Sequence, residues 1–214
     1  GIDFYRRAVQ LQHRYADGKR ITNALQTNGI LLDDEWGEFL HEHNFLVGLS
    51  IDGPREYHDH YRVDKGQSPT FDRVVAGLEA LKKHEVEFNT LTVLQNHNVT
   101  EPLLVYNFLK NIGSRFMQFI PIVERIAEEP AEDGLELIGP GFAGGAKVSR
   151  WSVGAAQYGK FLCRVFDEWV RRDVGDYFVQ MFDVALGSWV GQSSSLCIFA
   201  ETCGKALIIE HNGD

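Results

Sequence analysis

The sequence predicts an α/β fold built on a parallel sheet, and three observations lead to that class. Strand-like apolar runs alternate five times with helical stripes along the 214 residues. Polar turn residues close the runs, as where Asp52, Gly53 and Pro54 end FLVGLSIDGP. The 44% share of apolar residues supplies the core of a sizeable domain. Repeated strand-then-helix units require crossovers, and hence an open doubly wound sheet or a full or partial barrel.

Each element follows from its local pattern. Helices are expected where apolar residues recur at helical spacing, as Phe71, Val74, Val75 and Leu78 do. Strands are expected where short apolar runs end in turn residues. The predicted order is a helix within 1–20, a strand within 21–29, a helix within 32–44, a strand within 45–54, a helix within 70–85, a strand within 86–95, a helix within 101–113, a strand within 115–123, a helix within 158–173, a strand within 177–181 and a helix within 182–191.

Two segments depart from this alternation. Residues 124–152 are rich in acidic residues, Gly and Pro, which is typical of a functional or mobile loop at the end of a barrel strand. The final residues, KALIIEHNGD, are expected to form a strand entering an Asn-Gly hairpin, so a small β element begins near Leu196.

Composition excludes several classes of partner. The net charge of −9 provides no basic stripe for nucleic acid and no polybasic membrane anchor, and no apolar run is long enough to span a bilayer. An odd count of three cysteines favours a reducing cytoplasm over a disulfide framework. Phosphate-binding glycine motifs, a GxSxG nucleophile elbow and an HExxH zinc motif are all missing from the sequence.

Polar residues at the strand ends are the main candidates for binding. The carboxyl ends of parallel strands meet at one mouth, which brings together Gln26, Asp52, Asn96 and Gln118. Turn formation alone would also explain Asp52 and Asn96, and Gln118 could instead satisfy a buried backbone group.

The three cysteines divide into two kinds. Cys163 is expected to pack against the core from its helix. Cys197 and Cys203 are six residues apart around a small loop, which fits either two structural cysteines or part of a thiolate metal site.

The order of these motifs resembles the anaerobic sulfatase-maturating enzymes, which are radical S-adenosylmethionine enzymes with a C-terminal SPASM-type domain. The resemblance rests on LQTNG, then FLVGLSIDGPREYHDHYR, TFDRVVAGLEALKKHEVEFNTLTV and FMQFIP, and finally on the spaced cysteines before GKALIIEHNGD. It implies a partial (β/α)6 TIM-like barrel lacking its first strand over residues 1–190. It also implies the start of an auxiliary-cluster domain, with a small β hairpin, over 191–214.

The resemblance further implies a function. Members oxidise a Cys or Ser of a sulfatase polypeptide to Cα-formylglycine, using S-adenosylmethionine and 4Fe–4S clusters. By likeness, Gln26 lies near substrate, and Asn96, Arg62 and Gln118 line the S-adenosylmethionine pocket. Cys197 and Cys203 would be the first two ligands of an auxiliary cluster.

The sequence also departs from the family pattern. It contains no CxxxCxxC, so we expect a piece of a longer enzyme, cut at both ends, with its catalytic residues elsewhere. Such a piece would be inactive, hold no cluster and self-associate through an unpaired barrel edge. Two alternatives remain open: another SPASM peptide-modifying enzyme, for example a thioether-forming one, and a non-enzymatic adaptor that binds a sulfatase.

Overall fold

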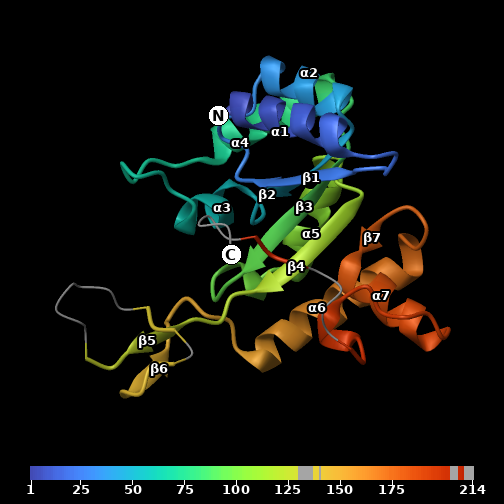
Figure 1. Ribbon diagram of the computed structural model, residues 1–214. Coiled ribbons are helices and arrows are strands. Elements are labelled where there is room, and N and C mark those ends of the chain that lie inside the picture. The colour runs from blue at the N-terminus through green and yellow to red at the C-terminus, as the bar shows by residue number, and fades with distance from the viewer. Residues whose placement is uncertain (130–136, 140, 203–206, 210–214) are drawn as a thin grey trace.

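A computed structural model of the chain describes residues 1–129, 137–139, 141–202 and 207–209. Its central feature is a sheet of five parallel strands in the order β1-β2-β3-β4-β7 (Figure 1). This confirms the predicted parallel α/β fold. The strands are β1 (Asn23–Thr27), β2 (Phe45–Ser50), β3 (Phe88–Leu94), β4 (Phe116–Pro121) and β7 (Phe178–Val179).

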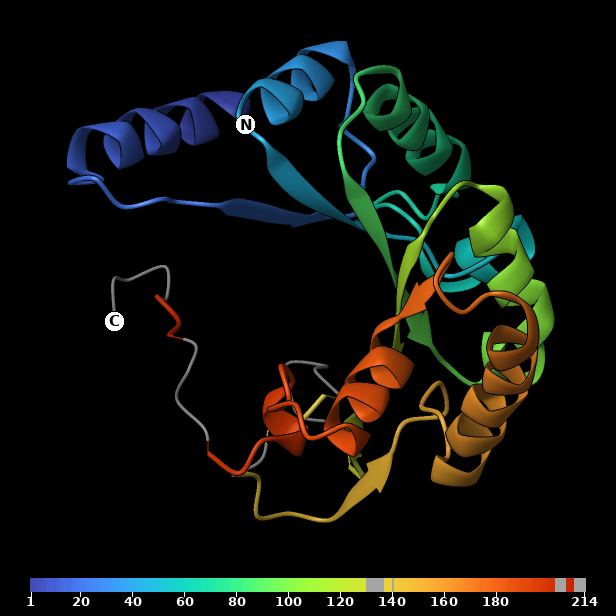
Figure 2. The same cartoon turned by 90° about the vertical axis from the view of Figure 1, so that its right-hand side faces the viewer.

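Helices connect the strands, and most of them cover the convex side of the curved sheet (Figure 2). Because the strand order never reverses, crossovers of one hand all return on the same side. A partial barrel has this one-sided cover, whereas a doubly wound sheet has helices on both faces. The helices are α1 (Ile2–Tyr15), α2 (Asp34–Glu42), α3 (Arg55–Tyr61), α4 (Phe71–Lys83), α5 (Pro102–Asn111), α6 (Ala155–Arg172) and α7 (Gln180–Trp189), with single 3-10 turns η1 (Asn98–Thr100) and η2 (Cys197–Phe199).

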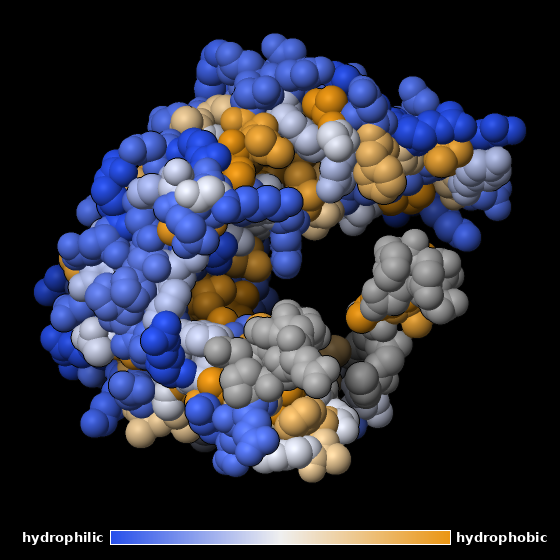
Figure 3. All heavy atoms as spheres, turned by 90° about the vertical axis from the view of Figure 1, so that its left-hand side faces the viewer, coloured by the Kyte–Doolittle hydropathy of each residue, from blue (hydrophilic) through white to orange (hydrophobic). Residues whose placement is uncertain are grey.

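The two faces of the sheet differ because side chains alternate along each strand. On β2, Val47 and Leu49 are fully buried against the helices, while Leu46 between β1 and β3 is 41% exposed. The buried residues form two clusters, one over β2, β3 and β4 and one around α1, α2 and β2. The concave face stays open, and Figure 3 shows the hollow that the curved sheet encloses.

Three expectations need correction. Helix α3 was not predicted, and residues 124–152, predicted as a loop, contain an antiparallel ribbon of β5 (Arg125–Ala127) and β6 (Ala146–Val148). Cys163 is exposed rather than packed, because the buried stripe of α6 runs through Phe161, Val165 and Trp169 at four-residue spacing and misses it.

The C-terminal hairpin is not tested. Most of it lies outside the described residues, and residues 207–209 are in no regular element.

The junction of α4 with the turn after β1 yields a stability prediction. A Cβ added at Gly77 would lie 2.3 Å from the carbonyl oxygen of Gly29, which is backbone and has little freedom to move. We expect Gly77→Ala to lower the free energy of unfolding by about 1–3 kcal/mol, the usual cost of overpacking. The measurement is urea denaturation.

Gly159→Ala in α6 is the matched control. Apart from its chain neighbours and the nearby backbone of α6, no atom lies within 4 Å of a Cβ built there. The greater helix propensity of Ala should raise stability by up to about 1 kcal/mol. Equal effects of the two substitutions would contradict the close α4 contact.

Candidate functional site

The predicted binding residues occupy two parts of the open side of the sheet. Gln26 is exposed on β1, in register with Gly48 of β2. Gln118 of β4 alternates with Met117 and Phe119, which pack on the helix side, so it faces the concave side. Arg62 follows α3 and Asn96 follows β3, both at the rim beyond the strand ends. The structure therefore separates an inner-face pair from a rim pair.

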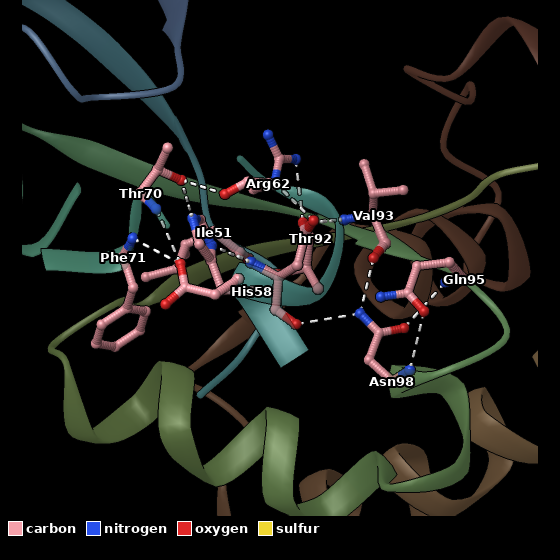
Figure 4. Close-up of polar contacts among 11 residues, drawn as sticks. Ile51, His58, Arg62, Thr70, Phe71, Thr92, Val93, Gln95 and Asn98 are labelled. Carbon is pink, nitrogen blue, oxygen red and sulfur yellow. Dashed lines mark hydrogen bonds and ion pairs between the residues drawn. The ribbon is translucent and has the colours of Figure 1, made fainter. Parts of the chain in front are cut away.

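At the rim, Arg62 belongs to a closed ring of hydrogen bonds (Figure 4). Its guanidinium donates to the carboxylate of Asp52, with Nε 2.6 Å from Oδ2 and Nη2 3.1 Å from Oδ1. The backbone N–H of Asp52 donates to His58 Nδ1 at 3.3 Å. His58 Nε2 lies 3.1 Å from Thr70 Oγ1, and the Thr70 hydroxyl donates to the Arg62 carbonyl at 2.7 Å. The ring of hydrogen bonds thus begins and ends at Arg62.

The donor directions in this ring of hydrogen bonds define the state of His58. Nδ1 accepts a backbone N–H, so a neutral imidazole carries its hydrogen on Nε2 and donates it to Thr70. The side chain is fully buried, and burial lowers the pKa of His58 to about 4, while nearby Asp52 partly opposes the shift. His58 is therefore neutral near pH 7.

A second group of amides ties the ends of β2 and β3 together. Asn98 is fully buried, and its Nδ2 donates to the carbonyls of Asp52 at 3.1 Å and Val93 at 2.8 Å. Its Oδ1 accepts from the backbone of Gln95 at 2.9 Å. The N–H of Val93 donates in turn to Asp52 Oδ1 at 2.9 Å. Asp52 is thus held from its side chain and from both sides of its backbone.

Asn96 is held between two segments that are distant in sequence. Its Oδ1 accepts from the Tyr61 hydroxyl at 2.9 Å, and its Nδ2 donates to the carbonyl of Arg150 at 2.6 Å. Its backbone N–H donates to the carbonyl of Trp151 at 3.1 Å. The amide therefore joins α3 to the segment that follows β6. Through its neighbour Tyr61, Arg62 belongs to the same rim.

The inner face contains an unpaired acceptor that sequence reasoning missed. Asn89 of β3 is in register with Gly48, and its Oδ1 is buried without a hydrogen-bond partner. A Cβ built on Gly48 would lie 3.2 Å from that oxygen, 3.2 Å from Gln26 Cγ and 2.7 Å from Leu91 Cδ1. Gly48 thus allows side chains from the neighbouring strands to close over β2. Within the described residues, Gln95 Nε2 is the other buried side-chain atom without a partner.

The structure describes one of the two predicted cluster ligands. Cys197 is a free, exposed thiol in η2, and Cys203 lies outside the described residues. Among the residues that the structure describes, no three His, Cys, Asp or Glu side chains are gathered as a metal site would require. Over the same ranges, none of the helices has the length and apolarity to cross a membrane.

The roles of Asp52 and His58 were not predicted, although the sequence contains a signal for them. His58 and Arg62 are four residues apart in a short polar segment directly after Asp52, so a helix there would place both on one side. Their common partner Thr70 is the residue before α4, far enough along the chain that local patterns do not reveal it.

Comparison with known proteins finds relatives of this chain. The family model of the Radical SAM superfamily matches residues 1–109. A serine-type anaerobic sulfatase-maturating enzyme of Bacteroides thetaiotaomicron is 46% identical over 213 residues, covering 100% of this chain and 51% of the relative. A cysteine-type enzyme of Clostridium perfringens is 34% identical over 217 residues, covering 100% of this chain and 54% of the relative.

Solved structures give the same picture. Histidine-tagged anSMEcpe with bound AdoMet matches with a TM-score of 0.81 and 33% identity, over 95% of this chain and 50% of that one. Native anSMEcpe with bound AdoMet and Cp18Cys peptide matches with a TM-score of 0.78 and 33% identity, over 92% and 51%. The expected partial radical SAM barrel is thereby confirmed. The chain spans about half the length of the relatives it matches.

The buried imidazole makes stability depend on pH. His58 has a pKa of about 4 in the folded protein against 6.5 as its ordinary value, so below pH 6.5 the unfolded chain binds a proton first. The contribution of the neutral, buried His58 to the free energy of unfolding is fully present above pH 6.5. We expect it to fall by up to about 1.4 kcal/mol per pH unit down to pH 4.

The measurement is urea denaturation at a series of pH values for the wild type and for His58→Asn. The substituted Asn offers an amide oxygen in place of Nδ1 and does not titrate. Subtracting one curve from the other isolates His58 from the carboxylates that titrate in the same range. Parallel curves would mean that His58 is not buried as a neutral side chain.

Proposed function

Because this chain belongs to the radical SAM superfamily, we propose that it is the barrel part of an anaerobic sulfatase-maturating enzyme. Such an enzyme is an oxidoreductase that converts a Cys or Ser of a sulfatase to Cα-formylglycine. The observation that carries the proposal is the 46% identity to a serine-type enzyme across the whole chain. Relatives of both the serine and cysteine types favour this function over thioether formation and over a non-enzymatic adaptor.

The open face of the sheet fits S-adenosylmethionine as cofactor. Ligands of parallel α/β folds lie beyond the carboxyl ends of the strands, where Arg62 and Asn96 are found, and Gln118 of β4 lies on the adjoining concave face. On the same concave face, the Oδ1 of Asn89 is buried and has no hydrogen-bond partner, so it could accept a hydrogen bond from a bound ligand. S-adenosylmethionine bound to a 4Fe–4S cluster supplies the radical that abstracts hydrogen from carbon.

This chain's own residues would bind and orient the reactants. Arg62 leaves its Nη1 outside the pair with Asp52, so that N–H edge is available to an acceptor oxygen of the cofactor. We assign Gln26, exposed on the same concave face, to the sulfatase peptide. Its amide can both donate to and accept from a peptide backbone.

We assign Cys197 and Cys203 to an auxiliary 4Fe–4S cluster. Helix α7 ends at Trp189, and the exposed Cys197 thiol follows in the single 3-10 turn η2 after a stretch without helix or strand, which supports a change of domain near residue 190. Two thiolates do not complete the four-ligand set of such a cluster. We therefore propose that residues 1–214 alone hold no cluster and are inactive.

Iron content tests this assignment. In the whole protein that contains this sequence, reconstituted anaerobically, we expect Cys197→Ala and Cys203→Ala each to lose roughly four irons, the content of one cluster. The readouts are iron and sulfide content with the visible absorption spectrum.

Cys163→Ala is the matched control, because Cys163 is an exposed cysteine on α6 that has no assigned role. It should keep the full iron content. The function itself is tested by mass spectrometry of a sulfatase peptide after anaerobic reaction with S-adenosylmethionine. A whole protein that binds iron and cofactor but never forms the aldehyde from either Cys or Ser would refute the proposed function.

A further inference from the structure

Arg62 is held by hydrogen bonds both at its backbone carbonyl and at its guanidinium. Its carbonyl accepts from the buried Thr70 hydroxyl, and its guanidinium donates twice to the Asp52 carboxylate. The Asp52 side chain is 4% exposed and that of Arg62 is 24% exposed. The guanidinium therefore bridges from a buried charge to the open rim.

Asp52 is itself immobilised before it meets Arg62. Its Oδ1 accepts from the N–H of Val93, its N–H donates to His58, and its carbonyl accepts from Asn98. These contacts come from β3, α3 and η1, so the carboxylate has one orientation relative to the sheet. An arginine paired through Nε and Nη2 then presents its Nη1 edge in one direction only.

We propose that Asp52 is a positioning residue that holds the Arg62 guanidinium in the orientation in which it meets S-adenosylmethionine. The inference rests on the proposed function, in which Arg62 contacts the cofactor. A long, flexible arginine would otherwise lose side-chain freedom when the ligand binds, and prior fixation removes that loss from the binding step.

A purely structural role for Asp52 makes a different prediction. If Asp52 only holds β2 and β3 together, its substitution would disturb the fold, and with it the Kd, whether or not Arg62 is present. As a positioning residue, it affects cofactor binding only through Arg62. Coupling between the two substitutions therefore separates these roles.

The experiment measures the Kd of S-adenosylmethionine by equilibrium dialysis in the whole, anaerobically reconstituted protein. Asp52→Asn and Arg62→Gln should each weaken binding about tenfold, and the double variant should bind no more weakly than Arg62→Gln alone. Asp72→Asn is the matched control. It removes a carboxylate paired with Arg55 on the exposed face of α4, and the Kd should stay at the wild-type value.

A second measurement needs no variant. In the wild type, the Nε–H of Arg62 donates to a buried carboxylate, so its NMR signal should exchange with water more slowly than those of exposed arginines. Exchange as fast as theirs would show that the guanidinium is not held, and would overturn the proposal even if Asp52→Asn fails to fold.

The remaining outcomes are also distinct. If the wild type binds the cofactor but the losses from Asp52→Asn and Arg62→Gln add, or Asp52→Asn leaves the Kd unchanged, Asp52 does not act through Arg62. The inference then fails and the proposed function stands. If the reconstituted wild type binds no S-adenosylmethionine, the proposed function fails and the inference fails with it.

Discussion

A carboxylate buried at the end of a parallel strand must be compensated, and at Asp52 this requirement organises the rim. An unpaired buried charge would cost several kcal/mol, so the chain after β2 has to return a cation and hydrogen-bond donors to it. Arg62 provides the positive charge. It follows Asp52 by ten residues, and the intervening helix α3 returns the chain to the end of β2. A buried ion pair of this kind adds little net stability compared with apolar packing. What it imposes is geometry, because the pair exists only if β2, β3 and α3 lie in one arrangement.

The one-sided cover of helices places that arrangement where a ligand can reach it. Helices pack on the convex face through the buried residues of β2, β3 and β4, so the residues that alternate with them, Gln118 among them, face the hollow. The carboxyl ends of the parallel strands lie at one edge, and the loops that follow them gather around Asp52 and Asn98. The segment after β6 joins the same edge through the carbonyl of Arg150 on Asn96. Segments more than fifty residues apart in the sequence thus meet at one rim.

Much of the fold could be predicted from the sequence because its strands and most of its helices have clear periodicity. Helix α3 could not, since REYHDHY lacks an apolar stripe and packs through His58, a polar residue satisfied by distant partners. The β5–β6 ribbon was hidden by Gly and acidic residues that normally indicate loops. The location of Asn96 beyond the end of β3 followed from strand polarity, whereas Gln118, expected at the same mouth, lies within β4 on the concave face. The partners of Asp52 did not follow from strand polarity, because Val93 and Asn98 lie more than forty residues further along the chain and reach Asp52 only through the pairing of β2 with β3.

The rim residues also show why protein contacts and ligand binding need not compete. Asn96 has partners at both ends of its amide, and Arg62 has used two of its three nitrogens. Such groups have already lost their rotational freedom on folding, so a ligand that meets the remaining N–H edge of Arg62 does not have to order it. The neutral state of His58 preserves this condition, because its unprotonated Nδ1 accepts the Asp52 backbone N–H. The cost of ordering these side chains therefore falls on folding and not on ligand binding.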